Sequence, residues 1–248
     1  MESLGTLELI FAALVVVAAY AVRGTAGFGG QAVAVPLLAL ILPLTVVIAA
    51  VAMLTALASL GQVRRDWRRI EWREIARLVP YTVLGVLAGL FLLQQLDVRT
   101  LVKAFGVFVI LYACFALASA SRPLAVSARF RYPLAALLGT SAAVAGTVFG
   151  AAGGPLYVIY LGTAGLEKNA FRATITTILG VLALLRIAGY AQLELYDLGV
   201  LTLVAAGLPL MFLGSRIGNW LAGRLEQKVF NRGVAVMLLA SGTALLFK

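Results

Sequence analysis

Long apolar runs separated by short polar loops make up most of the chain. Runs long enough to cross a bilayer occur at residues 4–22, 44–63, 76–93, 100–119, 133–149, 173–191, 197–214 and 230–247. A helix of about 20 apolar residues spans the roughly 30 Å hydrocarbon core. The pattern therefore predicts an all-α polytopic membrane protein with about eight full transmembrane helices.

Two further apolar segments, residues 31–42 and 154–164, are shorter than the others, and each follows a cluster of glycines. Segments of this length do not cross a bilayer comfortably. We expect two short broken or re-entrant helices here, and the sequence leaves open whether they cross fully or re-enter.

Loop charges predict the orientation of the chain. The loop 64–77 contains six arginines, and the loop 121–132 contains three. Short cytoplasmic loops of membrane proteins are enriched in Lys and Arg, so both loops are predicted to be cytoplasmic and the N-terminus external. The expected location is the plasma membrane, in a bacterium the inner membrane, with several passes.

Composition supports a lipid-embedded protein. The chain is 62% hydrophobic with a mean hydropathy of +1.03, well above the roughly 45–50% apolar content of soluble domains. Its net charge of +10 comes from loops between spans, so we expect the lipid bilayer rather than nucleic acid as its partner. Histidine is absent, and we predict no metal site, no cofactor and no enzyme activity.

An internal repeat is visible in two stretches. The Pro80, Gly85 and Gly89 pattern returns at Pro209, Gly214 and Gly218, at a constant shift of 129 residues. The glycine cluster from Gly27 returns from Gly150, at a shift of 123. We predict a first transmembrane repeat at 1–120, a cytoplasmic linker at 121–132 and a second, inverted repeat at 133–248. Inverted repeats with interrupted helices are typical of secondary transporters.

The two glycine clusters are candidate anion sites. Each precedes a short helix whose free N–H groups carry a partial positive charge. The alternative is that the glycines only allow helices to pack closely, which we favour for the pairs Gly85/Gly89 and Gly214/Gly218. The substrate-binding candidates at the clusters are Gly27, Gly29, Gly30, Gln31, Gly150, Gly153 and Gly154.

Three arginines within or beside apolar runs are further substrate-binding candidates: Arg23, Arg172 and Arg186. A guanidinium group matches sulfonate or sulfite oxygens well. The alternative for Arg23 and Arg172 is that they snorkel to the cytoplasmic interface or serve as a positive-inside signal. The alternative for Arg186 is that it pairs with Glu194 or approaches the external surface. Thr176 shares a helical face with Arg172 and completes the candidate set, although threonine in a span more often bonds to the preceding turn.

At these clusters the chain resembles the TauE/SafE family, in which a G-F-G-G-type break and an F-G-x-x-G-G-P break recur in the two halves. The residues that carry the resemblance are Gly27 to Gly30 and Phe149 to Pro155. Gln31 and the pair Ala151-Ala152 depart from the family pattern. The resemblance covers nearly the whole chain and implies a permease for sulfite, thiosulfate, sulfoacetate or a related anion.

We therefore predict a secondary transporter that moves a small anion by alternating access. An anion channel is the alternative, and an intramembrane enzyme is a weaker one because the spans lack the usual catalytic groups. All ten acids fall near predicted loops or span ends, so no span has an embedded Asp or Glu and the residue that would carry a coupling ion such as a proton is not identified. Substrate, direction and oligomeric state remain open.

Overall fold

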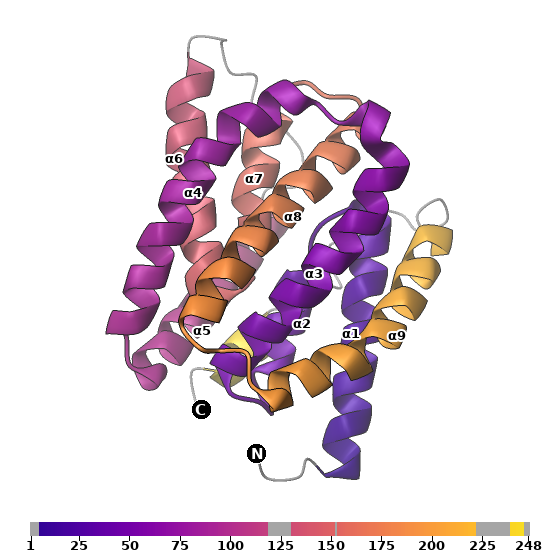
Figure 1. Ribbon diagram of the computed structural model, residues 1–248, viewed down its shortest axis with the longest axis vertical. Helices are drawn as coiled ribbons and strands as arrows, with labels where there is room; N and C mark the ends of the chain where they lie inside the picture. The colour runs from indigo at the N-terminus through magenta and orange to yellow at the C-terminus, as the bar shows by residue number, and fades with distance from the viewer. Residues whose placement is uncertain (1–4, 119–129, 152, 222–238, 246–248) are drawn as a thin grey trace.

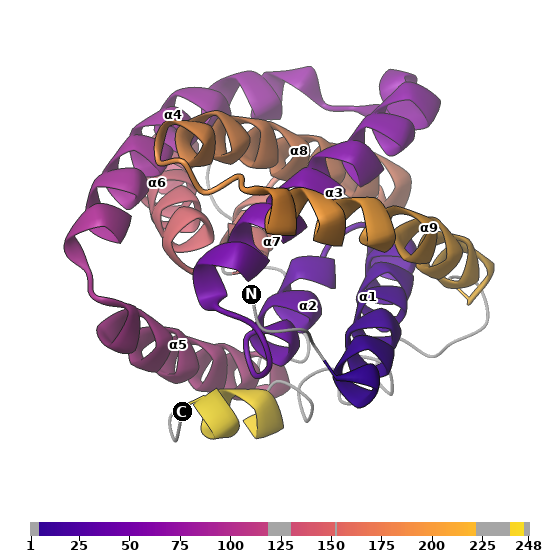
Figure 2. The ribbon, with the colours of Figure 1, turned by 60° about the horizontal axis from the view of Figure 1, so that its bottom comes forward.

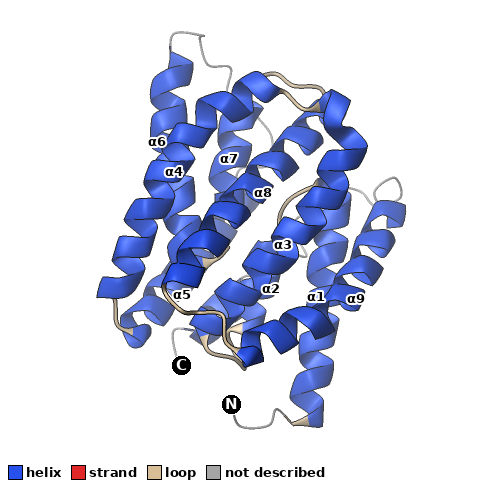
Figure 3. Ribbon diagram, viewed as in Figure 1, coloured by secondary structure: helices blue, strands red, loops and turns tan. Residues whose placement is uncertain are grey.

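A computed structural model of the chain describes residues 5–118, 130–151, 153–221 and 239–245. Helices joined by short loops make up this part, and no strand occurs in it (Figure 3). The helices are α1 (Thr6–Ala26), α2 (Gly30–Leu38), α3 (Leu44–Asp66), the 3-10 turn η1 (Trp67–Arg69), α4 (Trp72–Gln95), α5 (Val98–Ala118), α6 (Arg131–Phe149), α7 (Gly153–Gly162), α8 (Lys168–Gln192) and α9 (Leu198–Leu221). Residues 239–245 are also helical.

Six helices are long and apolar enough to cross a membrane, namely α1, α3, α4, α6, α8 and α9. The predicted all-α polytopic fold is confirmed. Helix α5 coincides with the predicted span 100–119, whereas most of the predicted span 230–247 lies outside the described residues. The number of eight full spans therefore remains a prediction.

The two short helices fold back beside the helices that precede them. Helix α2 runs along α1, and α7 runs along α6 (Figure 1). With nine and ten residues, they rise roughly 13–15 Å, about half of the hydrocarbon core. Both are thus short arms of helical hairpins, as the predicted broken helices require. Helix α2 also ends earlier than the predicted segment, because residues 39–43 turn the chain toward α3.

The helices pair across the two predicted halves. The most extensive contacts join α4 to α6 and α1 to α9, and α3 crosses α8 between them (Figures 1 and 2). Counterpart helices run in opposite directions: in Figure 1, α3 rises where α8 descends, and α4 descends where α9 rises. Opposed directions of this kind support the prediction of inverted halves.

Glycines on α4 and α9 provide the close approach in both interfaces. A Cβ on Gly85 would lie 2.5 Å from the Thr140 carbonyl oxygen of α6, and one on Gly214 would overlap the Val17 carbonyl oxygen of α1. The predicted packing role of these glycines is confirmed. Gly85 and Gly214 are related by the shift of 129, and Thr140 and Val17 by the shift of 123, so the sequence repeat also relates the contacts in space.

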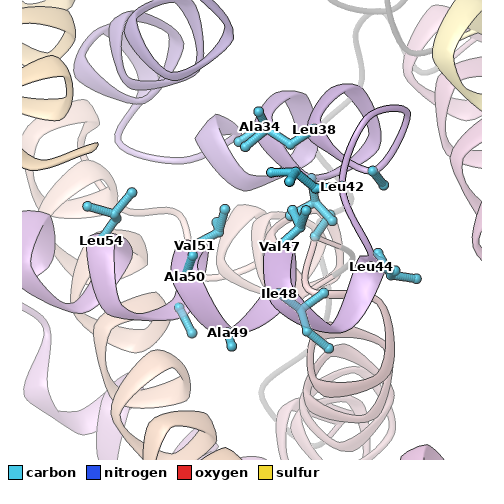
Figure 4. Packing of buried hydrophobic residues seen from close by; sticks show 14 of the residues in the cluster. Ala34, Leu38, Leu42, Leu44, Val47, Ile48, Ala49, Ala50, Val51 and Leu54 are labelled. Carbon is cyan, nitrogen blue, oxygen red and sulfur yellow. The ribbon is translucent and has the colours of Figure 1, made fainter. Parts of the chain in front are cut away.

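Apolar side chains fill the space between α2 and the first half of α3. Leu38 and Leu42 lie against Val47 and Val51, as Figure 4 shows. This layer lies at the end where α3 begins, opposite η1. The end that carries η1, with the arginines between Arg64 and Arg69, is called the arginine-rich end below and is uppermost in Figure 1.

Candidate functional site

The first glycine break ends α1 with a left-handed residue. Gly27 has φ +82° and donates its N–H to the carbonyl oxygen of Arg23 at 2.7 Å. Gly29 has φ +88° and caps the start of α2. Side chains other than glycine are disfavoured at such angles, so two glycines allow the chain to reverse within a few residues. The first residues of α2, with their free N–H groups, are thereby buried in the protein.

The second break repeats this geometry. Gly150 ends α6 with φ +74° and donates its N–H to the Gly146 carbonyl oxygen at 2.9 Å. Helix α7 then begins at Gly153. A side chain has no room at Gly150, because a Cβ there would lie 2.5 Å from Cγ2 of Ile48. Gly27 and Gly150 are thus the same helix cap, 123 residues apart.

Helix α8 binds the exposed carbonyl groups of the first break. Arg172 donates from Nη2 to the Gly24 carbonyl oxygen and to Oδ1 of Asn219, both at 2.6 Å. One turn later, Thr176 donates from Oγ1 to the Gly27 carbonyl oxygen at 3.0 Å. A cation at a helix C-terminus is favourable because the last carbonyl groups carry partial negative charge.

A second arginine and hydroxyl pair on α8 binds the other break. Arg186 donates from Nη1 to the Gly150 carbonyl oxygen at 3.3 Å and from Nη2 to that of Ile48 at 3.4 Å. Tyr190 accepts from Nε of Arg186 and donates to the Thr147 carbonyl oxygen at 2.5 Å. Arg186 is completely buried. The alternatives of an external approach and of a pair with Glu194 are wrong, because burial and these carbonyl groups account for the side chain.

The two breaks enclose a small central cavity of about 10 Å³. It is lined by Arg23, Gly29, Gln31, Ala32, Ala151, Gly154, Pro155 and Leu179. Gln31 has an exposed fraction of only 6%, and its Nε2 has no hydrogen-bond partner. A cavity of this size has room for about one water molecule. The lining offers hydrogen-bond donors, and no carboxylate belongs to it.

Arg23 is a buried cation at the edge of this cavity. Its exposed fraction is 3%, which rules out snorkelling to bulk water. Nη2 donates to Oγ of Ser59 at 2.7 Å. Within the described part of the chain, no carboxylate lies within ion-pair distance of Arg23. A buried guanidinium group with this little compensation is suited to an anionic partner.

The structure divides the predicted site residues into four groups. Arg23, Gly29, Gln31 and Gly154 line the central cavity together. Gly30 and Gly153 provide close contact within the two hairpins, against Ala19 and Ala142 respectively, while Gly27 and Gly150 are caps. Arg172, Thr176 and Arg186 bind carbonyl groups at the breaks.

Two larger pockets open toward the arginine-rich end. A pocket of about 850 Å³ is lined by Arg64, Arg65, Asp66, Trp67, Arg68, Arg69, Asn169, Arg172 and Asn219. A narrower one of about 220 Å³ extends deeper, between α1, α3 and α9. The first break therefore lies close to accessible space, whereas Arg186 at the second break is sealed.

A buried carboxylate was missed in the sequence. Glu74 lies in the first turn of α4, which begins at residue 72 rather than at the predicted 76. Both of its oxygens accept from Arg77, at 2.6 and 2.7 Å, and Tyr160 of α7 donates to it at 2.6 Å. Glu74 lies near a helix end, as expected for every acid of the chain, but its burial was not predicted. The i,i+3 spacing of Glu74 and Arg77 was the available signal.

Comparisons with known proteins agree with this architecture. The family model described as "Sulfite exporter TauE/SafE" matches residues 11–245. A protein of Comamonas testosteroni, named "Probable inner membrane transporter protein TsaS", is 29% identical over 184 residues, which cover 73% of this chain and 74% of that protein. No solved structure gives a significant match.

Proposed function

The chain belongs to the TauE/SafE family, and on that premise we propose that it is a secondary transporter that carries a small sulfur oxyanion or organosulfonate by alternating access. It is a multi-pass membrane transporter and not an enzyme. The printed name of the Comamonas testosteroni relative refers to an inner membrane, and we assign this chain to the plasma membrane.

One observation carries the proposed substrate class. The cavity between the two breaks is lined by a buried guanidinium group, an unpartnered amide donor and the starts of two helices, and no acid belongs to that lining. Helix N-termini and guanidinium groups favour anions. Sulfite, thiosulfate and sulfoacetate present several oxygens that accept such bonds from opposite sides.

We assign different roles to the candidate residues. Arg23 and Gln31 bind the anion directly, together with the N–H groups at Gly30 and Gly154. The arginine and hydroxyl pairs of α8 hold each break closed by binding the last carbonyl groups of α1 and α6. Rigid support of this kind keeps binding groups in position.

Alternating access follows from the arrangement of the halves. A cavity of about 10 Å³ has no room for a sulfonate group. Substrate entry therefore requires the two hairpins to separate, and transport requires the opening to alternate between the two membrane faces. We propose that the inverted repeats 1–120 and 133–248, joined by the linker 121–132, exchange conformations to achieve this.

The test is a thermal-shift and binding screen of the purified protein in detergent. The ligands are sulfite, thiosulfate, sulfoacetate, taurine, carboxylates and simple cations. A ligand that binds only the folded state raises the melting temperature in a saturable manner. Stabilisation by sulfur oxyanions or organosulfonates alone supports the proposal. Stabilisation by cations alone, or by no ligand, would refute the anion site and leave only the fold and family.

A further inference from the structure

The pocket of about 220 Å³ between α1, α3 and α9 has a lining rich in hydrogen-bond donors. Its polar lining residues are Arg23, Gln62, Arg65, Ser215, Arg216 and Asn219. Three of these are arginines, and no acid lines the pocket. Of these residues, only Arg23 is among the substrate-binding candidates predicted from the sequence.

Gln62 is the most informative residue of this pocket. Its exposed fraction is 8%, and its Nε2 has no hydrogen-bond partner. A buried donor without a partner carries an energetic cost, because it has given up its hydrogen bond to water. An oxyanion in the pocket would accept from this amide and remove that cost. Gln31 has the same unpartnered Nε2 in the central cavity, so both spaces offer an amide donor.

Asn219 is oriented by a neighbouring cation. Its Oδ1 accepts from Nη2 of Arg172, which directs the other end of the amide, a donor, away from Arg172. Arg65 and Arg216 are exposed and add positive charge at the mouth, while Arg23 adds a buried charge at the inner end. Donors thus converge from three helices on one space.

The pocket borders both of the other spaces. It shares Arg65 and Asn219 with the 850 Å³ pocket at the arginine-rich end. It shares Arg23 with the central cavity. Arg23 is therefore the residue that the pocket and the cavity at the glycine breaks have in common.

We propose that this pocket is a second anion-binding site, which holds a single small sulfonate or related oxyanion before the Arg23 side chain passes it to the central cavity. The inference rests on the proposed function for the identity of the anion. The volume of the pocket, about 220 Å³, accommodates one molecule of the size of sulfoacetate, whereas the central cavity of about 10 Å³ does not. Arg23 contacts the anion both in the pocket and in the central cavity. Its guanidinium group is held by the hydrogen bond to Ser59 while the anion occupies the pocket.

Cysteine protection tests the pocket without a transport assay. Cys114 is replaced by alanine, and Ala58, which lines the pocket, is changed to cysteine. The rate at which N-ethylmaleimide modifies Ala58→Cys is measured with increasing sulfoacetate and, separately, with increasing acetate. Only the empty pocket reacts, so we expect modification to slow about tenfold at about ten times the dissociation constant. Adding Gln62→Glu, which introduces a negative charge, should abolish this protection.

Matched variants separate binding from folding. Gln95→Glu makes the same change at the exposed end of α4 and should leave protection intact. Gln62→Leu loses no hydrogen bond from Nε2, so it should fold as well as the wild type while protection weakens. Arg216→Gln, at an exposed position, should weaken protection less.

The outcomes distinguish this inference from the proposed function. Protection by sulfoacetate that Gln62→Glu removes and Gln95→Glu retains supports the second site. Absence of protection by sulfoacetate and by acetate, in protein that remains helical and monodisperse, overturns it, even if the same protein transports organosulfonates in liposomes. Protection by acetate without any sulfonate transport supports the pocket as an anion site while refuting the proposed substrate.

Discussion

The two glycine breaks share a backbone but differ in their surroundings. Gly27 and Gly150 are the same left-handed cap, and each receives an arginine and a hydroxyl group from α8. At the first break Arg172 is partly exposed and lines the 850 Å³ pocket. At the second break Arg186 is completely buried. The two breaks thus share their backbone geometry but differ in how accessible their arginines are from the pocket.

Two breaks with the same backbone can therefore differ in access, because only the first lies beside a large pocket in the described part of the chain. If the halves are inverted repeats, exchanging their conformations would seal the first break and open the second. The two breaks also differ in sequence, and a conformational exchange cannot remove that difference. Gln31 and Arg23 belong to the first break, and the residues 123 positions later are Gly154 and Gly146. The first half therefore supplies the polar side chains of the cavity, whereas the second half has glycines at the corresponding positions.

The largest expected effect comes from adding a methyl group to the second cap. Gly150→Ala combines an unfavourable φ with a contact to Ile48, and we expect a loss of about 3–5 kcal/mol of stability. Thermal unfolding monitored by circular dichroism in detergent measures it. Gly154→Ala is the control, because nothing lies within 4 Å of its added Cβ. Equal melting temperatures for both variants would contradict the cap assignment.

The arginines of α8 sharpen the comparison. Arg186→Gln leaves buried carbonyl groups of Gly150 and Ile48 without a donor, and we expect a loss of about 3 kcal/mol. Arg172→Gln should cost less, about 1 kcal/mol, because water reaches the partly exposed site and can replace the guanidinium group. Melting temperatures of the two variants decide the order, and a larger loss for Arg172→Gln would reverse our interpretation of the two environments.

Gln31→Leu tests the polar contribution of the first break. Because Nε2 of Gln31 has no partner, its removal should leave the melting temperature within about 1 °C or raise it slightly. Affinity for the anion should fall about tenfold, the equivalent of one charge-assisted hydrogen bond. Calorimetric titration with sulfoacetate measures the affinity, and unchanged binding would remove Gln31 from the site.

The smallest effect is expected at the arginine-rich end. Arg68→Gln removes one exposed charge from the 850 Å³ pocket. The initial uptake or efflux rate should fall less than about threefold at low ionic strength and be unaffected at high salt, since exposed charges steer anions but are screened. A salt-independent loss would mean that Arg68 binds the substrate directly.

Periodicity and glycine content were sufficient to predict most of the fold. Long apolar runs identified the spans, and the shifts of 123 and 129 reappear as equivalent contacts at Gly85 and Gly214. Starting points of helices were less predictable: α8 begins at Lys168 rather than 173, because a polar first turn can remain helical at the membrane surface. The same effect concealed Glu74 in α4.

The site was predictable in composition but not in arrangement. Arg23, Gly29, Gln31 and Gly154 do meet at one cavity. The sequence did not reveal that Arg172 and Arg186 bind carbonyl groups, because those partners lie more than 30 residues away in the chain and on other helices. Nor could it show that the amide of Gln62 lacks a partner, which depends on the packing of α3 against its neighbours.

Crystallography with selenite, the selenium analogue of sulfite, tests the central claim most directly. Anomalous scattering locates the anion independently of the protein coordinates. We expect a selenium peak between the two breaks, within hydrogen-bonding distance of Gln31 and Arg23, with the hairpins moved apart to admit it. Selenite bound only at surface arginines, in protein that transports sulfite in liposomes, would contradict the claim that the paired glycine breaks form the substrate site.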